Sequence, residues 1–298
     1  MKKLHLVTAD TSLGSVNYGT ELAPQAMLKA GLESLLAEAG YSVRLADPVG
    51  HTRMGGSPHA KLRNAEHLLP WLKELQVRLM GTDPDEVQLT LGGDHSIGAP
   101  SMLATKRRHP DAVVVYVDAH PDAHALETTQ TGNIHGLPIR IAAGQTLEQI
   151  FSGPYYQTSE ICMVGLKDID DAEQAWLDRH GVRYFHMDSV LECGIGTVMN
   201  RVVEWVGGRP LHVSYDIDAI DAQFAPGTGI RNQGGLSYRE ADYVARRLGA
   251  LKPVSIDLVE VNPQRDIDNR TLELALELIL KLLGARWSSY ERYLHAGQ

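Results

Sequence analysis

The sequence predicts a single α/β domain with three layers, in which helices cover both faces of an eight-stranded, mostly parallel sheet. The 298 residues are 43% hydrophobic, enough to bury a substantial core. Short apolar runs rich in β-branched residues alternate with longer runs of helical periodicity, which is typical of parallel sheets whose strands are joined by helices. No internal repeat and no Pro/Gly-rich linker divides the chain. One domain over residues 1–298 is therefore the simplest prediction.

The strands are predicted where short apolar runs lie between turn residues or helical segments. Because several runs are apolar throughout, we expect them to be buried on both faces of the sheet. In chain order the predicted strands are Leu4–Ala9, Ser42–Ala46, Glu86–Leu91, Ala112–Val117, Ile161–Gly165, Val182–Phe185, Leu211–Tyr215 and Val254–Val259.

Helical patterns follow most of these strands. Two of them, Ala23–Ala39 and Leu62–Met80, are each followed directly by a glycine, a common helix stop. A third helix is predicted over Tyr238–Leu248, because Ser237 and Glu240 have the spacing of a capping box.

The composition argues against several classes of protein. Lys and Arg total 28 against 37 for Asp and Glu, a net charge of −9 without any basic block, so no nucleic-acid or membrane partner is expected. Cys162 and Cys193 lie far apart without a CxxC spacing, which indicates neither a disulfide framework nor a zinc-thiolate site. The first apolar run ends at Asp10, too short for a signal peptide, and no run of 18 apolar residues occurs. We therefore expect a cytoplasmic protein.

Ionisable residues gather directly after four of the predicted strands. The segments are GGDH at 92–95, DAHPDAH at 118–124, DID at 216–218 and EVNP at 260–263. In open parallel sheets, ligands bind beyond the carboxyl ends of the strands, so these segments are expected to converge on one site. The alternative is a set of separate, solvated polar loops.

The side chains in these segments suit divalent metal ions. In an extended chain, residues two apart share a face, which brings the ionisable residues of DAHPD together. Mixed oxygen and nitrogen donors suit Mn²⁺ and, less specifically, Fe²⁺, Co²⁺ or Zn²⁺. Six ligands exceed the need of one catalytic ion, but two ions that share carboxylates could use them all and hold a bridging hydroxide. The candidate ligands are His95, Asp118, His120, Asp122, Asp216 and Asp218.

Two further residues are candidates for catalysis. Glu260 at a neighbouring strand end could pair with a cationic substrate, and a guanidinium fits a carboxylate through two hydrogen bonds. The alternative for Glu260 is a structural pair with an arginine. His135, in the polar loop TGNIHG, is placed to shuttle protons. Asp94 either orients a ligand histidine or caps the next helix, and Asp221 is expected to brace its own loop.

These segments together resemble the ureohydrolase family and, within it, the arginases. They match in family order over nearly the whole chain, with a weaker match at GTELAP, 19–24. The resemblance implies a single ureohydrolase domain with an arginase/deacetylase-like fold. It also implies hydrolysis of L-arginine to L-ornithine and urea by a hydroxide that bridges two Mn²⁺ ions. The matching segments are LGGDHSIG at 91–98, VDAHPDAHALETTQTGNIHG at 117–136, GLKDID at 165–170, SYDIDAIDAQFAPGTG at 214–229, GGLSYRE at 234–240 and VEVNP at 259–263.

The resemblance further implies a role for each site residue. Asp122 would orient the hydroxide, Glu260 would hold the guanidinium and His135 would protonate the departing amine. One ion would be held by His95, Asp118, Asp122 and Asp216, and the other by His120, Asp118, Asp216 and Asp218. At the amino-acid end, Thr129 and Thr131 would bind the α-carboxylate, and Asp170 the α-amino group, with Asn133 and Glu173 acting through water. The run Asp168–Asp171 also has the composition of a helix N-terminus.

Two positions depart from the arginase pattern. His124 stands where arginases usually have asparagine, and we expect it to face the substrate. Arg231 stands where they have proline; it would either repel a guanidinium or reach outward to a carboxylate. Two alternatives therefore remain. The chain could act on another guanidino compound, such as agmatine, guanidinobutyrate, homoarginine or N-hydroxyarginine, or it could be a catalytically silent homologue that binds arginine or a metal. A homo-oligomer, trimer or hexamer, is expected by analogy with the family.

Overall fold

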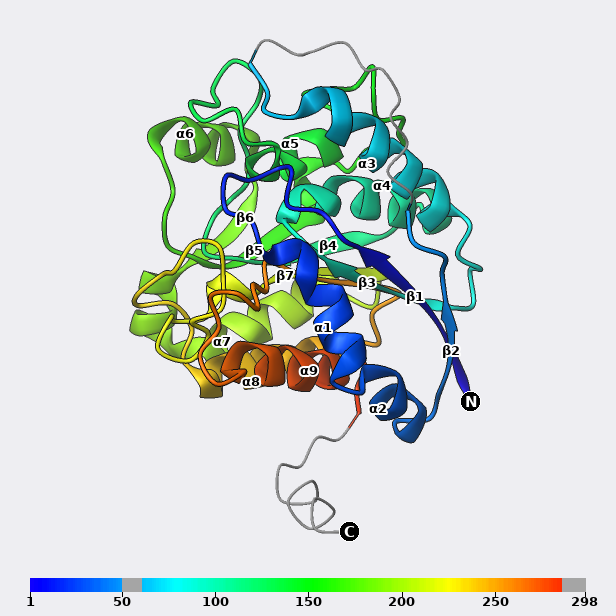
Figure 1. Cartoon of the computed structure of the whole chain (residues 1–298). Helices are drawn as coiled ribbons and strands as arrows, with labels where there is room; N and C mark the ends of the chain where they lie inside the picture. Colours follow the sequence, from blue (N-terminus) through cyan, green and yellow to red (C-terminus); the bar gives the residue numbers. More distant parts are fainter. Residues whose placement is uncertain (50–60, 286–298) are drawn as a thin grey trace.

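The computed structural model of the protein describes residues 1–49 and 61–285. Its centre is one sheet of eight strands in the order β2-β1-β3-β8-β7-β4-β5-β6 (Figure 1). Every neighbouring pair is parallel. All eight predicted strands are present, and their ends differ from the predicted ends by no more than two residues. The strands are β1 (Lys2–Ala9), β2 (Tyr41–Leu45), β3 (Val87–Gly92), β4 (Val113–Val117), β5 (Ile161–Leu166), β6 (Arg183–His186), β7 (Leu211–Asp216) and β8 (Ser255–Val259).

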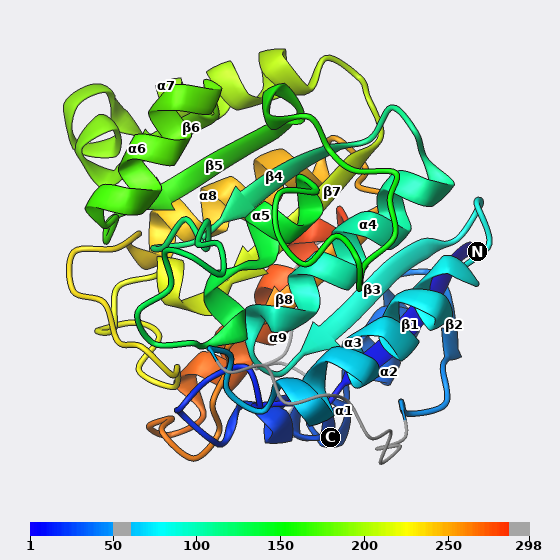
Figure 2. The same cartoon turned by 90° about the horizontal axis from the view of Figure 1, so that it is seen from above.

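Helices cover both faces of the sheet, as predicted (Figures 1 and 2). Their apolar side chains pack on strands such as β4, whose five residues are all buried. One layer consists of α3 (Ala65–Met80), α4 (Gly98–Arg108), α5 (Pro138–Ala142) and α6 (Asp171–His180). The other layer consists of α1 (Ala23–Lys29), α2 (Leu32–Glu38), α7 (Met187–Val206), α8 (Tyr238–Gly249) and α9 (Arg270–Leu282).

The prediction of one continuous helix over Ala23–Ala39 is wrong. The segment predicted over Ala23–Ala39 forms two helices, because Gly31 has φ 91° and lies in the left-handed region. Residues other than glycine rarely adopt that backbone conformation, and a continuous α-helix cannot pass through it. The apolar residues keep nearly the same spacing on both sides of the break, so periodicity alone does not show it.

The other two helix predictions differ less from the structure. The helix predicted from Leu62 begins at Ala65, after Asn64, whose φ of 51° excludes it from the helix. The capping box of Ser237 and Glu240 opens α8 as predicted. In the described parts of the chain, none of the helices is long and apolar enough to span a bilayer.

The strand order explains why polar segments from distant parts of the chain meet. The four strands that precede these segments are β3, β4, β7 and β8, and they are consecutive in the sheet as β3-β8-β7-β4. All pairs among them are parallel, so their carboxyl ends lie along the same edge. The four polar segments are therefore brought together by the sheet itself.

Candidate metal centre

Six side chains form a buried group at this edge of the sheet, which we call the His–Asp cluster: His95, Asp118, His120, Asp122, Asp216 and Asp218. His95 opens a short 3-10 turn after β3, and the two sets of aspartates follow β4 and β7. The four aspartates are all buried, and His120 is the one member that is partly exposed.

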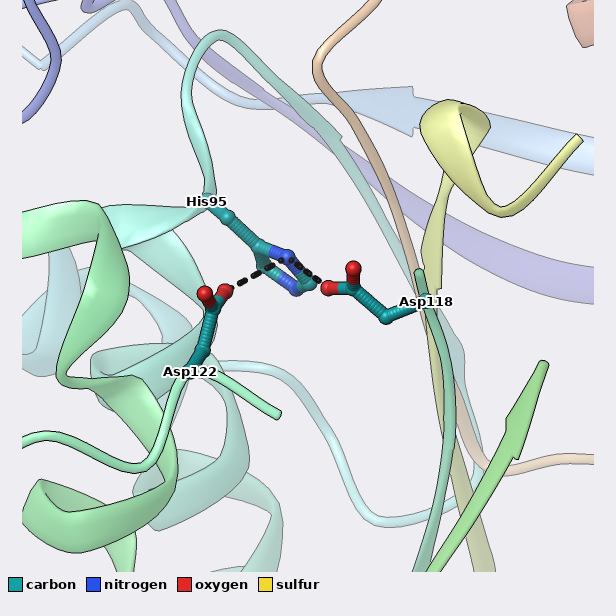
Figure 3. Close-up of side chains that lie close together, drawn as sticks. All are labelled: His95, Asp118 and Asp122. Carbon is teal, nitrogen blue, oxygen red and sulfur yellow. Dashed lines mark ion pairs between the residues drawn. The ribbon is translucent and has the colours of Figure 1, made fainter. Parts of the chain in front are cut away.

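His95 is the centre of one half of the cluster. Its Nδ1 lies 3.0 Å from Asp118 Oδ2, 3.3 Å from Asp122 Oδ2 and 3.1 Å from Asp216 Oδ2. Figure 3 shows the imidazole between the carboxylates of Asp118 and Asp122. Ligands at about 2.1 Å from one cation and at right angles to each other lie roughly 3 Å apart. The distances from His95 Nδ1 to the three oxygens therefore fit ligands around a single ion.

His120 is the centre of the other half. Its Nδ1 lies 3.2 Å from Asp218 Oδ2 and 3.5 Å from Asp118 Oδ1. Asp118 thus presents Oδ2 to His95 and Oδ1 to His120. A carboxylate with one oxygen in each group is placed to bridge two ions.

The cluster is costly without a cation. Burial and the charge of Asp118 raise the pKa of Asp122 to about 7. Burial, with the charges of Asp218 and Asp118, raises the pKa of Asp216 well above its usual range. Among the described residues, Asp118 Oδ2 is buried and has no hydrogen-bond partner, although a histidine nitrogen lies 3.0 Å away. Divalent ions would remove these penalties, so the donor set fits them.

Backbone amides orient three of the four carboxylates. His120 N donates to Asp118 Oδ1 over 2.7 Å, and Asp218 N donates to Asp216 Oδ1 over 2.8 Å. Ala119 N donates to Asp218 Oδ1 over 3.4 Å. The first two bonds join an aspartate to the amide two residues later, a local turn that the DAH and DID spacings allow. The same spacing therefore supplies two candidate metal ligands and fixes the direction of the first.

Two residues that the sequence interpretation missed lie directly behind His95. Its Nε2 is 2.9 Å from Ser214 Oγ, which leaves Nδ1 to face the carboxylates. The ring of Tyr116 stacks on the imidazole, with centroids 4.6 Å apart and planes 2° apart. Both residues precede a cluster aspartate by two positions and so share its face of the sheet. That spacing is the signal by which they could have been found.

Tyr116 is also bonded to Asp122. Its hydroxyl donates to Asp122 Oδ2 over 2.8 Å and lies 3.0 Å from His95 Nδ1. Burial and the charge of Asp122 raise the pKa of Tyr116 well above its usual range. The phenol is therefore a neutral hydrogen-bond donor.

Glu260 links the cluster to His135. Its Oε1 accepts from the backbone N–H of His95 over 2.9 Å and lies 3.2 Å from His135 Nδ1. Burial lowers the pKa of His135, but the hydrogen bond and charge of Glu260 outweigh burial and raise it to about 9. Glu260 and Asp122 both have positive φ, 62° and 48°, a strained conformation that is concentrated at functional sites. Among residues 1–49 and 61–285, the ion-pair partner of Glu260 is a histidine and not an arginine.

A cavity of about 250 Å³ opens beside the cluster. Of the predicted site residues, His95, Asp118 and Asp170 are not among its lining residues. The other predicted site residues all contribute to its wall. The lining consists of His120, Asp122, His124, Thr129, Thr131, Asn133, His135, Gly136, Glu173, Asp216, Asp218, Ile230 and Glu260.

His124 lies between the cavity and Asp170. Its Nε2 is 3.1 Å from Asp170 Oδ2, and its Nδ1 is 3.2 Å from Thr128 Oγ1. Asp170 Oδ1 also accepts from the backbone amides of Ala172 and Glu173, each over 2.9 Å, and so caps α6. The predicted helix N-terminus at this run is confirmed, and the carboxylate of Asp170 already has three partners.

Three further expectations can be compared with the contacts. Asp94 accepts from the amides of Gly14 and Ser96, so it caps the turn after β3 and does not bond to a histidine. Asp221 braces its loop, as predicted, through two backbone amides. Arg231 donates to two backbone carbonyls, over 2.7 Å each, and to no carboxylate of the described residues, contrary to the expectation that it reaches outward to one. The adjacent Ile230, and not the arginine, lines the cavity.

A three-layer α/β fold with a buried group of imidazoles and carboxylates at the carboxyl edge of its sheet is the arrangement expected of a metal-dependent hydrolase. The model of the Arginase family matches residues 2–284. An arginase of Staphylococcus aureus is 31% identical, covering 95% of this chain and 97% of that relative. The crystal structure of arginase from Bacillus cereus has a TM-score of 0.90 at 27% identity, covering 97% of this chain and 100% of the other. Arginase of Entamoeba histolytica, in complex with L-ornithine, has a TM-score of 0.87 at 27% identity, over 95% and 99%.

The chain belongs to the Arginase family. It is a hydrolase of the kind that cleaves C–N bonds in linear amidines. Members of the family are binuclear metal enzymes, which agrees with a cluster whose donors form two groups.

Proposed function

We propose that this protein hydrolyses the guanidinium group of L-arginine to L-ornithine and urea, with two Mn²⁺ ions. The observation that carries the proposal is the placement of Glu260 and His135 in one cavity with the His–Asp cluster. The ions would supply the nucleophile, since divalent metals bring the pKa of bound water close to neutral. Mn²⁺ is favoured because four carboxylates and two imidazoles form an oxygen-rich mixed set, and Co²⁺, Fe²⁺ or Zn²⁺ are possible substitutes.

The residues around the cavity have distinct tasks in this reaction. Both contacts of Glu260 use Oε1, which leaves Oε2 to accept N–H groups of the guanidinium. Asp122 would orient the attacking oxygen toward the guanidinium carbon. As the bond from this carbon to the substrate's side-chain nitrogen breaks, His135 would give its proton to the departing amine, and Asp122 would take the hydroxyl proton of the attacking oxygen as the urea carbonyl forms. A histidine whose pKa is about 9 holds that proton at neutral pH.

The direct test is urea release from L-arginine by purified, Mn²⁺-loaded protein, with metal-stripped protein as the control. Urea above the control is expected. Tight binding of arginine and of two ions without turnover would support a catalytically silent homologue. No urea from arginine or from other guanidino compounds would reject the proposal.

Replacing His135 by asparagine should lower kcat about 100-fold and change KM little. The proton donor is lost, whereas the metal ligands and Glu260 remain, and general acid catalysis contributes roughly 10² to 10⁴ in rate. Steady-state kinetics measures both constants. His67→Asn, at an exposed position of α3, is the matched control and should behave as wild type. Equal kcat in both variants would remove His135 from the mechanism.

A second candidate substrate is a guanidino acid that lacks an α-ammonium group. The contact between His124 and Asp170 favours it, because Asp170 already accepts from two amides and faces the imidazole. The hydroxyl oxygens of Thr129 and Thr131 accept from backbone amides, so their hydrogens are free to donate to a carboxylate. The cavity thus offers hydrogen-bond donors for the carboxylate of a substrate. The carboxylate of Asp170, which would bind an ammonium group, is already engaged by His124.

His124→Asn should therefore raise the preference for L-arginine over 4-guanidinobutyrate by about tenfold in kcat/KM. The shorter amide would no longer reach Asp170, which would free that carboxylate for an ammonium group. Urea release from both substrates, together with agmatine, homoarginine and N-hydroxyarginine, measures the change. An unaltered ratio would show that the contact does not set specificity.

A further inference from the structure

We infer that Tyr116 is a positioning residue, whose hydroxyl holds the carboxylate of Asp122 toward the metal centre. The inference concerns the orientation of one ligand and rests on the proposed function for its catalytic consequence. It starts from a difference among the four aspartates of the His–Asp cluster.

Three of these aspartates are oriented by the backbone. Asp118, Asp216 and Asp218 each accept a backbone N–H on Oδ1, and each has Oδ2 near a histidine nitrogen. A backbone amide has little freedom to move, so the direction of each of these carboxylates is set as the chain folds.

Asp122 is the exception. Within residues 1–49 and 61–285, no backbone amide donates to its carboxylate, and the hydrogen-bond donor that reaches Oδ2 is the hydroxyl of Tyr116, over 2.8 Å. The backbone of Asp122 has φ 48°, in a loop that leaves the sheet after β4. Without that hydroxyl, the side chain would keep only its contact of 3.3 Å with His95 Nδ1.

Tyr116 is held as firmly as a backbone donor. It is fully buried within β4, and its ring lies flat against the imidazole of His95, with 2° between the planes. In the register of β4 and β7 its Cα partner is Ser214, which bonds to the other nitrogen of the same imidazole. Tyr116 and Ser214 together therefore fix the orientation of His95, and the hydroxyl of Tyr116 also fixes that of Asp122.

Tyr116→Phe removes the hydroxyl and keeps the stacked ring. We expect the affinity for Mn²⁺ to fall about tenfold and kcat to fall by a similar factor, with KM changed less than about threefold, as is usual when a partner of a metal ligand is lost. The melting temperature of the metal-free protein should stay close to that of wild type. The d–d absorption bands of the Co²⁺-loaded protein should shift, because one ligand changes its orientation.

Tyr215→Phe is the matched control. Tyr215 is also fully buried, at the end of the adjacent strand β7, but its hydroxyl has no hydrogen-bond partner among the described residues. The loss of that hydroxyl should leave Mn²⁺ affinity, kcat and the Co²⁺ spectrum unchanged. Equal losses in the two variants would mean that buried hydroxyls matter only for packing, and the inference would be overturned.

A double-mutant cycle decides whether Tyr116 acts through Asp122. In an Asp122→Ala background, Tyr116→Phe should change Mn²⁺ affinity less than about twofold, because its target is absent. A persisting tenfold loss, or wild-type affinity in the single variant, would overturn the inference. Metal affinity is measured without substrate, so failure to release urea from any guanidino compound would reject the proposed function and leave this test intact.

Discussion

Replacing Asp118 by alanine should strip metal from both halves of the His–Asp cluster and lower urea release by about 10⁴-fold or more. Asp118 gives one oxygen to the group around His95 and the other to the group around His120. Its loss would remove a ligand from each of the two proposed ions, and a nucleophile that depends on both ions would be lost with them. A factor of 10⁴ corresponds to about 5.5 kcal/mol in the activation barrier.

Metal content per chain and kcat/KM together measure this effect. The matched control is Asp111→Ala, because Asp111 is an exposed aspartate just before the other end of the same strand, β4. The control should bind two ions and turn over normally. If Asp118→Ala also kept two ions and full activity, the assignment of a bridging carboxylate would be wrong.

Replacing Glu260 by glutamine should lower kcat/KM about 10³-fold while both ions stay bound. Glutamine keeps an oxygen that can accept from the backbone N–H of His95, so the metal side of the site remains oriented. It loses the negative charge that would pair with a guanidinium, and truncating one partner of a buried charge pair costs roughly 2–5 kcal/mol. The same change removes the main cause of the raised pKa of His135, so a smaller fraction of His135 holds a proton at neutral pH.

Two further variants make this result interpretable. Glu260→Ala also removes the acceptor for the His95 amide, so it should weaken metal binding where glutamine does not. Glu192→Gln, on an exposed position of α7, controls for the loss of one negative charge. A Glu260→Gln protein with wild-type kcat/KM would exclude Glu260 from substrate binding.

The strands and the candidate metal ligands were predictable because their signals are local. Strand periodicity and the alternation in DAHPD depend on residues within a few positions of each other. Gly31 interrupts a helix without altering the apolar spacing, so the break in that helix could not be seen in the pattern. The position of β8 between β3 and β7 depends on long-range pairing, which no short segment encodes.

The contacts that refine the site were harder to predict. Tyr116 lies in an apolar strand, where an aromatic residue suggests core packing, and its bond to Asp122 depends on how the following loop turns. His124 and Asp170 are far apart in sequence, and their contact arises where α6 begins beside the loop after β4. Residue types predict which chemistry is present, whereas the choice of partners depends on the folded backbone.

The place of β8 in the sheet also determines when the site residues reach their final spacing during synthesis of the chain. β8 is the last strand in the described part of the chain, yet it lies between β3 and β7, and Glu260 follows its end. Until it is inserted, the edges of β3 and β7 have no partner there, and the ligands after those strands have no fixed spacing. Such late, non-local pairing is slow compared with local folding. Until β8 is inserted, a nascent chain therefore carries the candidate ligands without their final spacing, and we expect ion binding to tighten only after that step.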